Sequence, residues 1–335
     1  MRAQRLHAPA SIDDAPLQRD EVAIPVPGPT DIVVQVEACA ICRTDLHVIE
    51  GELPSIKMPV IPGHQVVGRV VDGGEAARHY GRGDRVGIAW LRYTDGTCRF
   101  CTHGAENLCP NAAFTGYMAD GGYAEYAAVD EAFAYHIPET IEAVQAAPLL
   151  CAGIIGYRAL KRSEIKPGQR LGMYGFGASA HVSIQIARHW GCEVYVATRG
   201  EGHQALAREM GAVWVGDSAD SPPDKLDAAI IYAPAGDLVP VALEALDRGG
   251  TLALAGIYMA DVPPLDYERH LFYERSVRSV TANTREDGRE LLRLAVDVPI
   301  KTRVETFPLD AANDALQRLK HDRINGSGVL VLSDS

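Results

Sequence analysis

What the sequence lacks narrows the classes of protein to which this chain can belong. Across its 335 residues there is no run of about 18 consecutive apolar residues, the length that a membrane-spanning helix needs. Residues 1–10 hold no apolar stretch that could form the core of a signal peptide. Internal repeats and low-complexity segments are absent as well. We therefore expect a cytoplasmic globular protein that has no membrane partner.

Positive charge is also in short supply. The chain has 32 Lys and Arg residues against 44 Asp and Glu residues, which gives a net charge of −12. Binding to phosphate backbones or to anionic lipid surfaces depends on clustered positive charge. We therefore expect no nucleic-acid partner.

Length and cysteine number set two further expectations. A chain of 335 residues exceeds the size at which one hydrophobic core keeps growing, so we expect two domains. The number of cysteines is odd, at seven. In a reducing compartment, close Cys pairs more often hold metal than form disulfides.

Five of the seven cysteines fall into two clusters that have the residue types of metal sites. The first cluster joins the motif Cys42-Arg-Thr-Asp-Leu-His47, the motif Gly63-His64-Gln65 and a distant Cys151. The second is a short knuckle that contains Asp95, Cys98, Cys101 and Cys109. Three ligands with a hydroxyl nearby are typical of a catalytic zinc that keeps an open position, whereas four ligands in one loop are typical of a closed, structural zinc. A chain with both is expected to be an enzyme.

The remaining cysteines and most other histidines have plainer interpretations. Cys39 lies in a predicted strand and Cys192 follows a predicted helix, so both are expected to be small packing residues. We expect His79, His189 and His270 to be ordinary surface groups.

The first 140 residues are predicted to form a β-rich domain with long loops. Apolar and β-branched residues recur in short runs that are typical of strands, and three prolines exclude a helix between residues 22 and 29. The predicted strands are residues 31–39, 66–72, 84–90 and 123–129.

After residue 140 the pattern changes to alternating helices and strands. Residues 141–162 are rich in Ala and Leu and are predicted to be helical. Alternation with about 30 residues per unit then predicts a doubly wound parallel sheet. Its strands are expected at residues 171–174, 193–198, 228–232 and 251–255, and its helices at 179–190, 202–210 and 238–246. A helix at 285–295 and a strand at 328–332 lie outside this alternation and are expected to rejoin the first domain.

A glycine-rich turn stands between the first predicted strand and helix of that sheet. It is a Gly-x-Gly-x-x-Ala fingerprint, formed by Gly175, Phe176, Gly177, Ala178, Ser179 and Ala180. Such glycines let backbone N–H groups approach a pyrophosphate, and the helix N-terminus favours its negative charge. The alternative is a plain strand-to-helix turn, but the position before a second strand favours a dinucleotide site.

The end of the second strand indicates which nicotinamide cofactor is bound. NAD sites usually place a carboxylate there for the ribose diol, but Thr198 and Arg199 occupy this position. Arg199 suits a 2′-phosphate through charge-assisted hydrogen bonds, with the Thr198 hydroxyl as a second donor. We therefore predict a preference for NADP(H) over NAD(H). Arg199 could instead be a solvated loop charge, and Glu201 is the feature that could reverse the assignment.

Taken together, these motifs resemble those of zinc-dependent alcohol dehydrogenases of the medium-chain dehydrogenase/reductase family, over essentially the whole chain. Those that carry the resemblance are the two cysteine clusters, the glycine-rich turn, Gly121-Gly-Tyr-Ala-Glu125 and Pro148-Leu-Leu-Cys151. The resemblance implies an α/β protein with a GroES-like β-rich catalytic domain and a doubly wound Rossmann domain inserted within it. The expected bounds are residues 1–152 and 283–335 for the catalytic domain and 153–282 for the Rossmann domain. It also implies a homotetramer, with a dimer as the alternative.

By this resemblance Cys42, His64 and Cys151 hold the catalytic zinc, whose remaining position is open to substrate. A zinc ion in such a site acts as a Lewis acid on an alcohol oxygen, and hydride passes to the nicotinamide.

The neighbours of these ligands are assigned roles by the same resemblance. Thr44 is expected to hydrogen-bond the substrate oxygen, and His47 to complete the proton relay towards solvent. Asp45 is expected to orient His64, and Arg43 to contact the cofactor's pyrophosphate.

The sequence departs from the family pattern at three places. Gln65 stands where a Glu is common, so the negative charge that could tune the metal is missing. Asp95 stands where the knuckle usually has its first Cys, and we expect the carboxylate to serve as the fourth zinc ligand. The alternatives are that His103 supplies that ligand or that the knuckle has lost its zinc. Gly326-Ser-Gly328 lacks the Arg that many relatives place on the cofactor phosphates.

The predicted function is the interconversion of primary alcohols and aldehydes with a nicotinamide cofactor and two zinc ions per chain. Trp90 matches an aromatic residue that narrows the substrate pocket towards small alcohols, although a core Trp at a strand end fits as well. The enzymatic alternatives are an NAD-linked alcohol dehydrogenase and a reductase of larger aromatic or conjugated aldehydes. An inactive nucleotide-binding scaffold is the alternative from another class.

Overall fold

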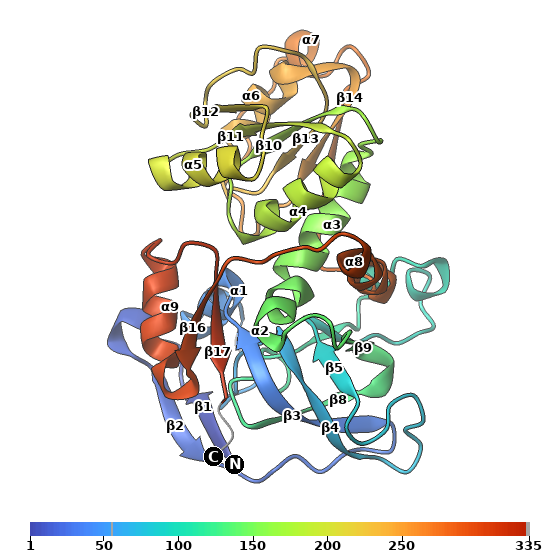
Figure 1. Ribbon diagram of the computed structural model, residues 1–335, viewed down its shortest axis with the longest axis vertical. Helices are drawn as coiled ribbons and strands as arrows, with labels where there is room; N and C mark the ends of the chain where they lie inside the picture. The colour runs from blue at the N-terminus through green and yellow to red at the C-terminus, as the bar shows by residue number, and fades with distance from the viewer. Residues whose placement is uncertain (55, 333–335) are drawn as a thin grey trace. The chain divides into compact units, whose positions relative to one another are not determined.

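The computed structural model describes residues 1–54 and 56–332, and the chain divides into two compact units. The first unit comprises residues Met1–Cys151, Ala282–Val296 and Lys301–Ser335. The second comprises Ala152–Thr281 and Asp297–Ile300. By the colour scale of Figure 1, residues 152–281 of the second unit run from green to orange, and the blue N-terminal and red C-terminal segments belong to the first unit.

The first unit is built around a seven-stranded, mainly antiparallel sheet. Its strands follow the order β16-β17-β3-β4-β5-β9, and β8 pairs with β3 as well. Two smaller sheets join β1 to β2 and β6 to β7. The strand bounds are β1 (Arg2–Leu6), β2 (Leu17–Glu21), β3 (Asp31–Ala40), β4 (Val66–Gly73), β5 (Arg85–Ile88), β6 (Leu91–Tyr93), β7 (Ala113–Phe114), β8 (Tyr126–Asp130), β9 (Ala134–His136), β16 (Val304–Pro308) and β17 (Ser327–Val331).

β3 is the central strand of this sheet because apolar residues line most of its length. Ile32, Val34 and Val36 are buried in one core together with Leu316 and Leu330, which lie near the other end of the chain. The C-terminal strand β17 pairs antiparallel with β3. The two ends of the chain are therefore held in one hydrophobic core.

Among its described residues the first unit has four α-helices and six short 3-10 helices. α8 starts where Thr284 caps it, since the Asp287 N–H donates to Thr284 Oγ1 at 3.2 Å and Asp287 Oδ2 accepts from the Thr284 N–H at 2.9 Å. The helices are α1 (Arg43–Ile49), α2 (Ala143–Ala146), α8 (Arg285–Asp297) and α9 (Ala312–Lys320). The 3-10 helices are η1 (Ile12–Asp14), η2 (Cys101–His103), η3 (Glu106–Leu108), η4 (Glu131–Phe133), η5 (Ala147–Leu150) and η6 (Leu309–Ala311).

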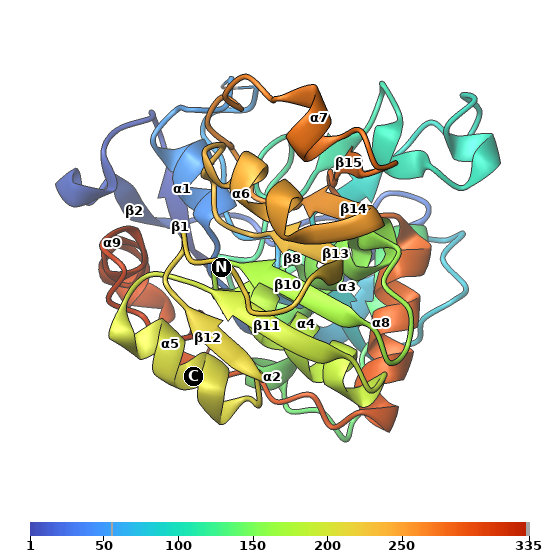
Figure 2. The ribbon, with the colours of Figure 1, turned by 90° about the horizontal axis from the view of Figure 1, so that it is seen from above.

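The second unit is a six-stranded parallel sheet in the order β12-β11-β10-β13-β14-β15. In chain order this is 3-2-1-4-5-6, the order of dinucleotide-binding doubly wound folds. Figure 2 shows most of these strands side by side. The strands are β10 (Arg170–Tyr174), β11 (Glu193–Ala197), β12 (Trp214–Gly216), β13 (Leu226–Ile231), β14 (Leu246–Leu254) and β15 (Ser276–Ser279).

Helices cover both faces of this parallel sheet. α3 and α4 pack against each other and against the sheet, and α6 packs on β13 and β14 from the other side. α6 buries Leu238, Val239 and Leu243 there, in one core with Ile231 and Leu252. The helices are α3 (Ala152–Ser163), α4 (Ala178–His189), α5 (Glu201–Glu209), α6 (Leu238–Ala245) and α7 (Tyr267–His270).

The predicted helix at residues 141–162 is broken into three pieces. α2 is followed by η5, which has Pro148 in its first turn, where the missing N–H costs nothing. Cys151 then has φ −134° and ψ −70°, outside the helical region, before α3 begins. The break lies at the residue expected to be a metal ligand.

Elsewhere the predicted strands and helices are present, with ends that shift by a few residues. The strand predicted at 123–129 begins only at Tyr126. His189 is exposed, and the side chain of His79 is 74% exposed, as predicted. The prediction for His270 is wrong: its side chain is 6% exposed, because α7 packs on α6 and places Nε2 3.1 Å from Glu244 Oε1.

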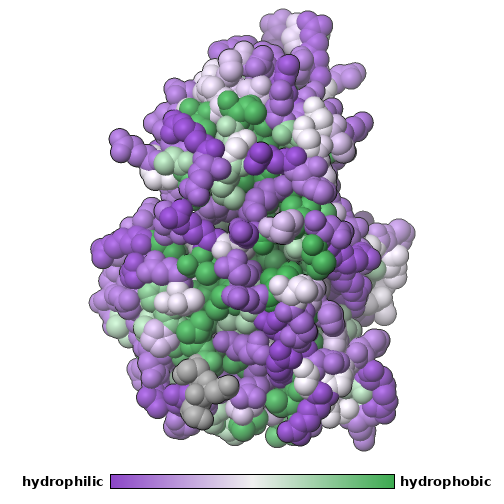
Figure 3. Space-filling view, viewed as in Figure 1, coloured by the Kyte–Doolittle hydropathy of each residue, from purple (hydrophilic) through white to green (hydrophobic). Residues whose placement is uncertain are grey.

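The surface in view in Figure 3 is largely hydrophilic, with hydrophobic side chains in separate patches. In the described part of the chain no single helix is long and apolar enough to cross a membrane, and one bent pair, α2–η5 followed by α3, reaches the length and apolar composition only when its two parts are taken together.

Candidate functional site

The first cluster is assembled where β3 ends and α1 begins. Cys42 is the N-cap residue of α1, and its backbone N–H donates to Asp45 Oδ2 at 2.8 Å, which fixes the first turn of the helix. One ligand atom from each of Cys42, His64 and Cys151 lies within 4.8 Å of the others. The two sulfur atoms are 3.9 Å apart. Three ligands that are distant in the sequence thus converge at one point of the first unit.

His64 presents one ring nitrogen to this point and uses the other for a hydrogen bond. Nδ1 lies 2.9 Å from Asp45 Oδ1, and both side chains are at most 2% exposed. Nε2 is buried and forms no hydrogen bond within residues 1–54 and 56–332. A buried nitrogen without a partner is costly unless it binds something. The lone pair of Nε2 and two sulfurs therefore fit a zinc ion, which prefers N and S ligands.

The ionisation of these side chains also suits a cation. Burial lowers the pKa of His64, but the Asp45 carboxylate and the Cys42 thiolate raise it by more, so that it is about 10. A hydrogen bond from the Cys151 thiol lowers the pKa of Cys42 well below its ordinary value and raises that of Cys151. The pocket between these atoms thus favours positive charge at Nε2, whether from a proton or from a metal ion.

Tyr123 contacts the first cluster through Asp45, and the sequence alone assigned no role to this tyrosine. Its hydroxyl donates to Asp45 Oδ2 at 2.9 Å. Burial, and then the Asp45 charge, raise its pKa well above the ordinary value, so Tyr123 stays a donor. The Tyr123 ring also explains Gly63, because a Cβ added there would lie 2.3 Å from Tyr123 Cδ1. The only signal in the sequence was the motif that surrounds Tyr123.

The predicted relay residues lie on successive turns of α1. Thr44 is buried, and its Oγ1 is 3.6 Å from Cys42 Sγ. His47 lies three residues further on, with a side chain that is 16% exposed and an Nδ1 that pairs with Glu52. Residues at i and i+3 share one face of a helix. The hydroxyl is therefore beside the metal ligands, and the imidazole lies towards solvent.

Trp90 and Gln65, the aromatic and amide neighbours of His64, are each held in place by contacts with other residues. Trp90 lies edge-on to His64, with ring centroids 5.0 Å apart, and it stacks on Phe114 and Tyr117 at 4.9 and 6.0 Å. Phe114 and Tyr117 were not identified from the sequence. Gln65 is buried and donates through Nε2 to the Ala40 carbonyl at 3.3 Å, so this side-chain amide is held by the strand.

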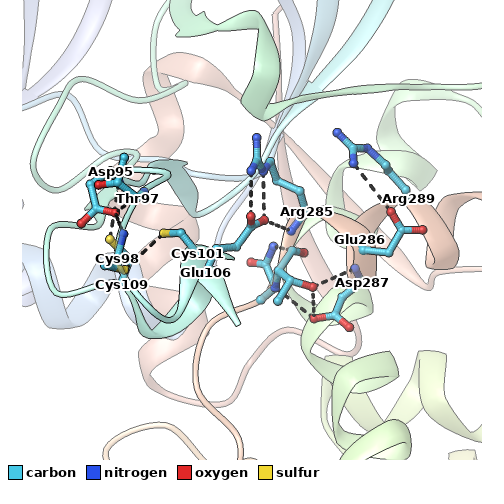
Figure 4. Close-up of polar contacts among 12 residues, drawn as sticks. Asp95, Thr97, Cys98, Cys101, Glu106, Cys109, Arg285, Glu286, Asp287 and Arg289 are labelled. Atoms are coloured by element: carbon cyan, nitrogen blue, oxygen red, sulfur yellow. Dashed lines mark hydrogen bonds and ion pairs between the residues drawn. The ribbon is translucent and has the colours of Figure 1, made fainter. Parts of the chain in front are cut away.

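The second cluster is the knuckle (Figure 4). A ligand atom from each of Asp95, Cys98, Cys101 and Cys109 lies within 4.8 Å of the other three. The Sγ atoms of Cys98 and Cys101 are 3.5 Å apart. Three thiols and one carboxylate form a donor set that suits tetrahedral zinc. His103 lies outside the cluster, with Nδ1 2.7 Å from the Arg99 carbonyl.

The Asp95 carboxylate is held by hydrogen bonds as well. Oδ1 accepts from the backbone N–H groups of Thr97 and Cys98 at 2.9 Å, and Oδ2 accepts from Asn111 Nδ2 at 2.9 Å. The Cys98 and Thr97 N–H groups are the main reason that the pKa of Asp95 lies below its usual value. Asp95 is therefore ionised, as a metal ligand must be.

Glu106 ties the knuckle to α8. It accepts from Arg285 Nε at 2.9 Å, from Arg285 Nη2 at 2.7 Å and from the Arg285 backbone N–H at 2.8 Å (Figure 4). Burial raises the pKa of Glu106, but its hydrogen bonds to Arg285 lower it by more. The two side-chain contacts form a bidentate, charge-assisted ion pair, here called the Glu106–Arg285 fork. It joins residues that are 179 positions apart in the sequence.

In the second unit the glycine-rich turn connects β10 to α4. Gly175 has φ +88°, a conformation that favours glycine. Gly177 is the exposed N-cap of α4, and a Cβ added to it would meet no described heavy atom within 4 Å. Phe176 and Ala180 are buried, while Ala178 and Ser179 are partly exposed at the start of the helix. The open space over Gly177 and the following helix N-terminus fit a phosphate group.

The predicted cofactor-selecting residues follow β11. Thr198 is buried, and its carbonyl accepts from Gln204 Nε2 at 3.0 Å. Arg199 is exposed and forms no ion pair within the described residues. Glu201 is the first residue of α5, where the helix dipole stabilises a negative charge. Arg199 is thus available to an anionic ligand. Arg43, by contrast, pairs with Asp322.

Comparison with known proteins agrees with this arrangement. Residues 28–139 match the alcohol dehydrogenase GroES-like domain, and residues 180–297 match the zinc-binding dehydrogenase domain. A Mycobacterium tuberculosis protein named "Probable alcohol dehydrogenase AdhA" is 51% identical over 99% of this chain and 97% of its own length. An alcohol dehydrogenase of Geobacillus stearothermophilus is 35% identical over 95% of this chain and 96% of its own.

A solved structure agrees as well. The cinnamyl alcohol dehydrogenase SbCAD4 from Sorghum bicolor superposes with a TM-score of 0.89, is 26% identical, and covers 98% of this chain and 97% of its own. The β-rich first unit thus contains a GroES-like domain, and the parallel sheet of the second unit is of the Rossmann type. The chain belongs to the zinc-binding alcohol dehydrogenases of the medium-chain dehydrogenase/reductase family.

Proposed function

We propose that this protein interconverts primary alcohols and aldehydes with NADP(H), using a zinc ion held by Cys42, His64 and Cys151. The observation that carries the proposal is the buried Nε2 of His64, which faces two thiols and has no hydrogen-bond partner among the described residues. When bound, the zinc supplies a Lewis acid for the substrate oxygen. The first unit is then the catalytic domain, and the second holds the nucleotide.

The residues of the chain have separate tasks in this reaction. Asp45 keeps the proton of His64 on Nδ1, so that Nε2 is left free for the metal. The Thr44 hydroxyl would hydrogen-bond the substrate oxygen, taking up the alcohol proton while it gives its own proton to the relay towards His47, and a bound nicotinamide would supply the hydride acceptor. His47 passes that proton to solvent, and its contact with Glu52 orients the ring. Trp90 narrows the space beside His64.

We propose Arg199 and Thr198 as the residues that bind the 2′-phosphate of NADP(H). Their position after β11 is where a carboxylate would stand in an NAD site. Arg43 is assigned to the pyrophosphate of the same cofactor. An NAD-linked enzyme is the alternative, in which Glu201 binds the ribose.

A second zinc ion is proposed for the knuckle, with Asp95 as its fourth ligand. Its support is the convergence of one carboxylate and three thiols. We further propose a cytoplasmic homotetramer, with a dimer as the alternative; the free thiols of all seven cysteines agree with a reducing compartment.

Reduction of larger aromatic aldehydes is a second candidate function, because SbCAD4, a cinnamyl alcohol dehydrogenase, resembles this chain in structure. Initial rates over a panel of aliphatic and aromatic alcohols and aldehydes, each with NADP(H) and with NAD(H), test both proposals. The first predicts the highest kcat/KM for small primary substrates with NADP(H). Absence of turnover with every pair would leave the inactive scaffold as the better interpretation.

A further inference from the structure

Arg43 and Asp322 form an ion pair at the junction of two helices of the first unit. Arg43 is the first residue of α1, directly after Cys42, and Asp322 follows the C-cap of α9. Arg43 Nη2 lies 2.5 Å from Asp322 Oδ1. α1 and α9 are neighbours (Figure 1). The two side chains are 47% and 76% exposed, so solvent and dissolved anions reach the pair.

Each charge of this pair stands at the unfavourable end of its own helix. A helix N-terminus carries partial positive charge, which disfavours the guanidinium of Arg43. A helix C-terminus carries partial negative charge, which disfavours the carboxylate of Asp322 beyond α9. Because neither charge is stabilised by its helix, the contact between the two side chains offsets part of both unfavourable helix-dipole interactions.

Asp322 lies in the left-handed region directly after α9. Its φ is +52°, a conformation that Gly or Asn most often and Asp less often occupies after a helix. The backbone thus tolerates an aspartate at this position, whereas the helix dipole disfavours its charge. The contact with Arg43 is the interaction that its carboxylate gains.

We propose that Asp322 sets the affinity for the cofactor by competing with its phosphates for Arg43. This inference rests on the proposed function, which assigns Arg43 to the pyrophosphate. A phosphate that binds the guanidinium must first displace the carboxylate. The Gly326-Ser-Gly328 segment contains no arginine, and the next basic residue in the sequence is the exposed Arg323, directly after Asp322.

The competition lowers the affinity and shortens the time that the cofactor stays bound. With Asp322 in place the pair is close to neutral, and without it one full positive charge faces the phosphates. Exposed ion pairs contribute up to about 1 kcal/mol, so we expect removal of Asp322 to tighten binding about two- to five-fold. Asp322 therefore raises the dissociation constant of the cofactor.

The test is the variant Asp322→Asn, because Asn tolerates the left-handed backbone and keeps the size of the side chain. The dissociation constants of NADPH and NADH are measured by titrating nicotinamide fluorescence at low and at high salt. We expect a lower Kd for the variant, and a Kd that rises more steeply with salt because one more positive charge is screened. Asp310→Asn, which removes an exposed charge paired with Arg19 at 3.4 Å, is the matched control and should leave Kd unchanged.

Two further variants separate this inference from the proposed function. Arg43→Gln should weaken binding of both cofactors, and Asp322→Asn should have no effect in the Arg43→Gln background. If Arg43→Gln weakens binding but Asp322→Asn leaves Kd unchanged or raises it, Asp322 does not compete and this inference alone is wrong. If Arg43→Gln binds like the wild type, the assignment of Arg43 is wrong. If the wild-type protein binds neither NADPH nor NADH, the proposed function fails and the inference with it.

Discussion

Asp45 Oδ1 lies 2.9 Å from His64 Nδ1, and this pair is almost completely buried. The other oxygen of Asp45 accepts from Tyr123 and from the Cys42 backbone N–H. Both carboxylate oxygens of Asp45 are thus used, to hold His64, Tyr123 and the start of α1. The proton on Nδ1 is fixed by this contact, so Nε2 is the ring nitrogen that faces the two sulfurs and can exchange its proton for a metal ion.

Replacement of Asp45 by Asn should weaken zinc binding at this site about 10- to 100-fold, because the amide can present N–H to Nδ1 and favour the wrong tautomer. The measurement is a zinc competition titration with a chromophoric chelator. Asp20→Asn is the matched control, since Asp20 contacts His7 Nε2 at the same 2.9 Å on the surface. Equal zinc affinities for Asp45→Asn and wild type would contradict the role given to Asp45.

The knuckle gives a prediction that separates two roles of Asp95. Asn at position 95 can still accept from the Thr97 and Cys98 N–H groups but cannot provide a negative ligand. If the carboxylate binds metal, Asp95→Asn should lower the zinc content from about two to about one per chain, whereas Asp95→Cys should keep it. Elemental analysis of zinc in the purified proteins distinguishes a metal ligand from a residue that only shapes the turn. Two zinc ions in Asp95→Asn would mean that the side chain only shapes the turn.

Arg199→Asp should reverse the cofactor preference. Loss of a charge-assisted hydrogen bond and addition of a negative charge should lower the ratio of kcat/KM for NADPH to that for NADH about ten-fold or more. Steady-state rates with both cofactors measure this ratio. Arg208→Asp, at the far end of α5, is the control for charge alone. If Glu201→Gln instead impairs NADH use in the wild-type background, the NAD-linked alternative is favoured.

Two glycines with the same φ of +95° allow a strict comparison. Gly63→Ala would place a Cβ 2.3 Å from the Tyr123 ring, whereas Gly83→Ala would meet nothing within 4 Å. We expect Gly83→Ala to lower the free energy of unfolding by about 1 kcal/mol, the backbone cost alone. Gly63→Ala should lower it by about 2–4 kcal/mol and should also reduce zinc content, because His64 is the next residue. Denaturant unfolding and metal analysis test this, and equal losses for the two variants would argue against the Tyr123 contact.

The Glu106–Arg285 fork should stabilise the first unit more than a surface pair does. Arg285→Lys cannot form both side-chain contacts, and we expect a loss of about 1–2 kcal/mol in the free energy of unfolding. Arg293→Lys, which changes an exposed pair with Glu286, should cost under about 0.5 kcal/mol.

The same fork has a pH signature whose sign follows from the lowered pKa of Glu106. Its contribution is fully present above the unfolded pKa of Glu and is lost as the pH falls through the lower folded value. Stability should therefore decrease with acid less steeply in Glu106→Gln than in the wild type. Identical slopes in thermal unfolding from pH 6 to pH 3 would contradict this.

Much of the fold could be predicted from the sequence because apolar periodicity is a local property. β3, β4 and the alternating elements of the second unit were predicted within a few residues of their ends. The short edge strands β12 and β15 were missed, since their pattern is weak and their stability comes from tertiary packing. α9 was missed although Ala312, Ala315 and Leu316 recur at helical spacing on its buried face.

Contacts between distant residues were harder to predict. The break at Cys151 was hidden in an Ala- and Leu-rich stretch, and only the resemblance to a family pointed to that cysteine. No local sequence pattern indicates three of these contacts: the hydrogen bond from Tyr123 to Asp45, the stacking of Phe114 and Tyr117 on Trp90, and the pairing of Arg43 with Asp322. They arise where separate loops meet in the folded unit.

The most direct test of the metal site is a crystal structure with anomalous diffraction data collected at the zinc absorption edge. We predict a strong anomalous peak about 2.0–2.3 Å from Cys42 Sγ, His64 Nε2 and Cys151 Sγ. A second peak is expected among Asp95, Cys98, Cys101 and Cys109. A zinc-replete crystal without density between Cys42, His64 and Cys151 would contradict the proposed catalytic site.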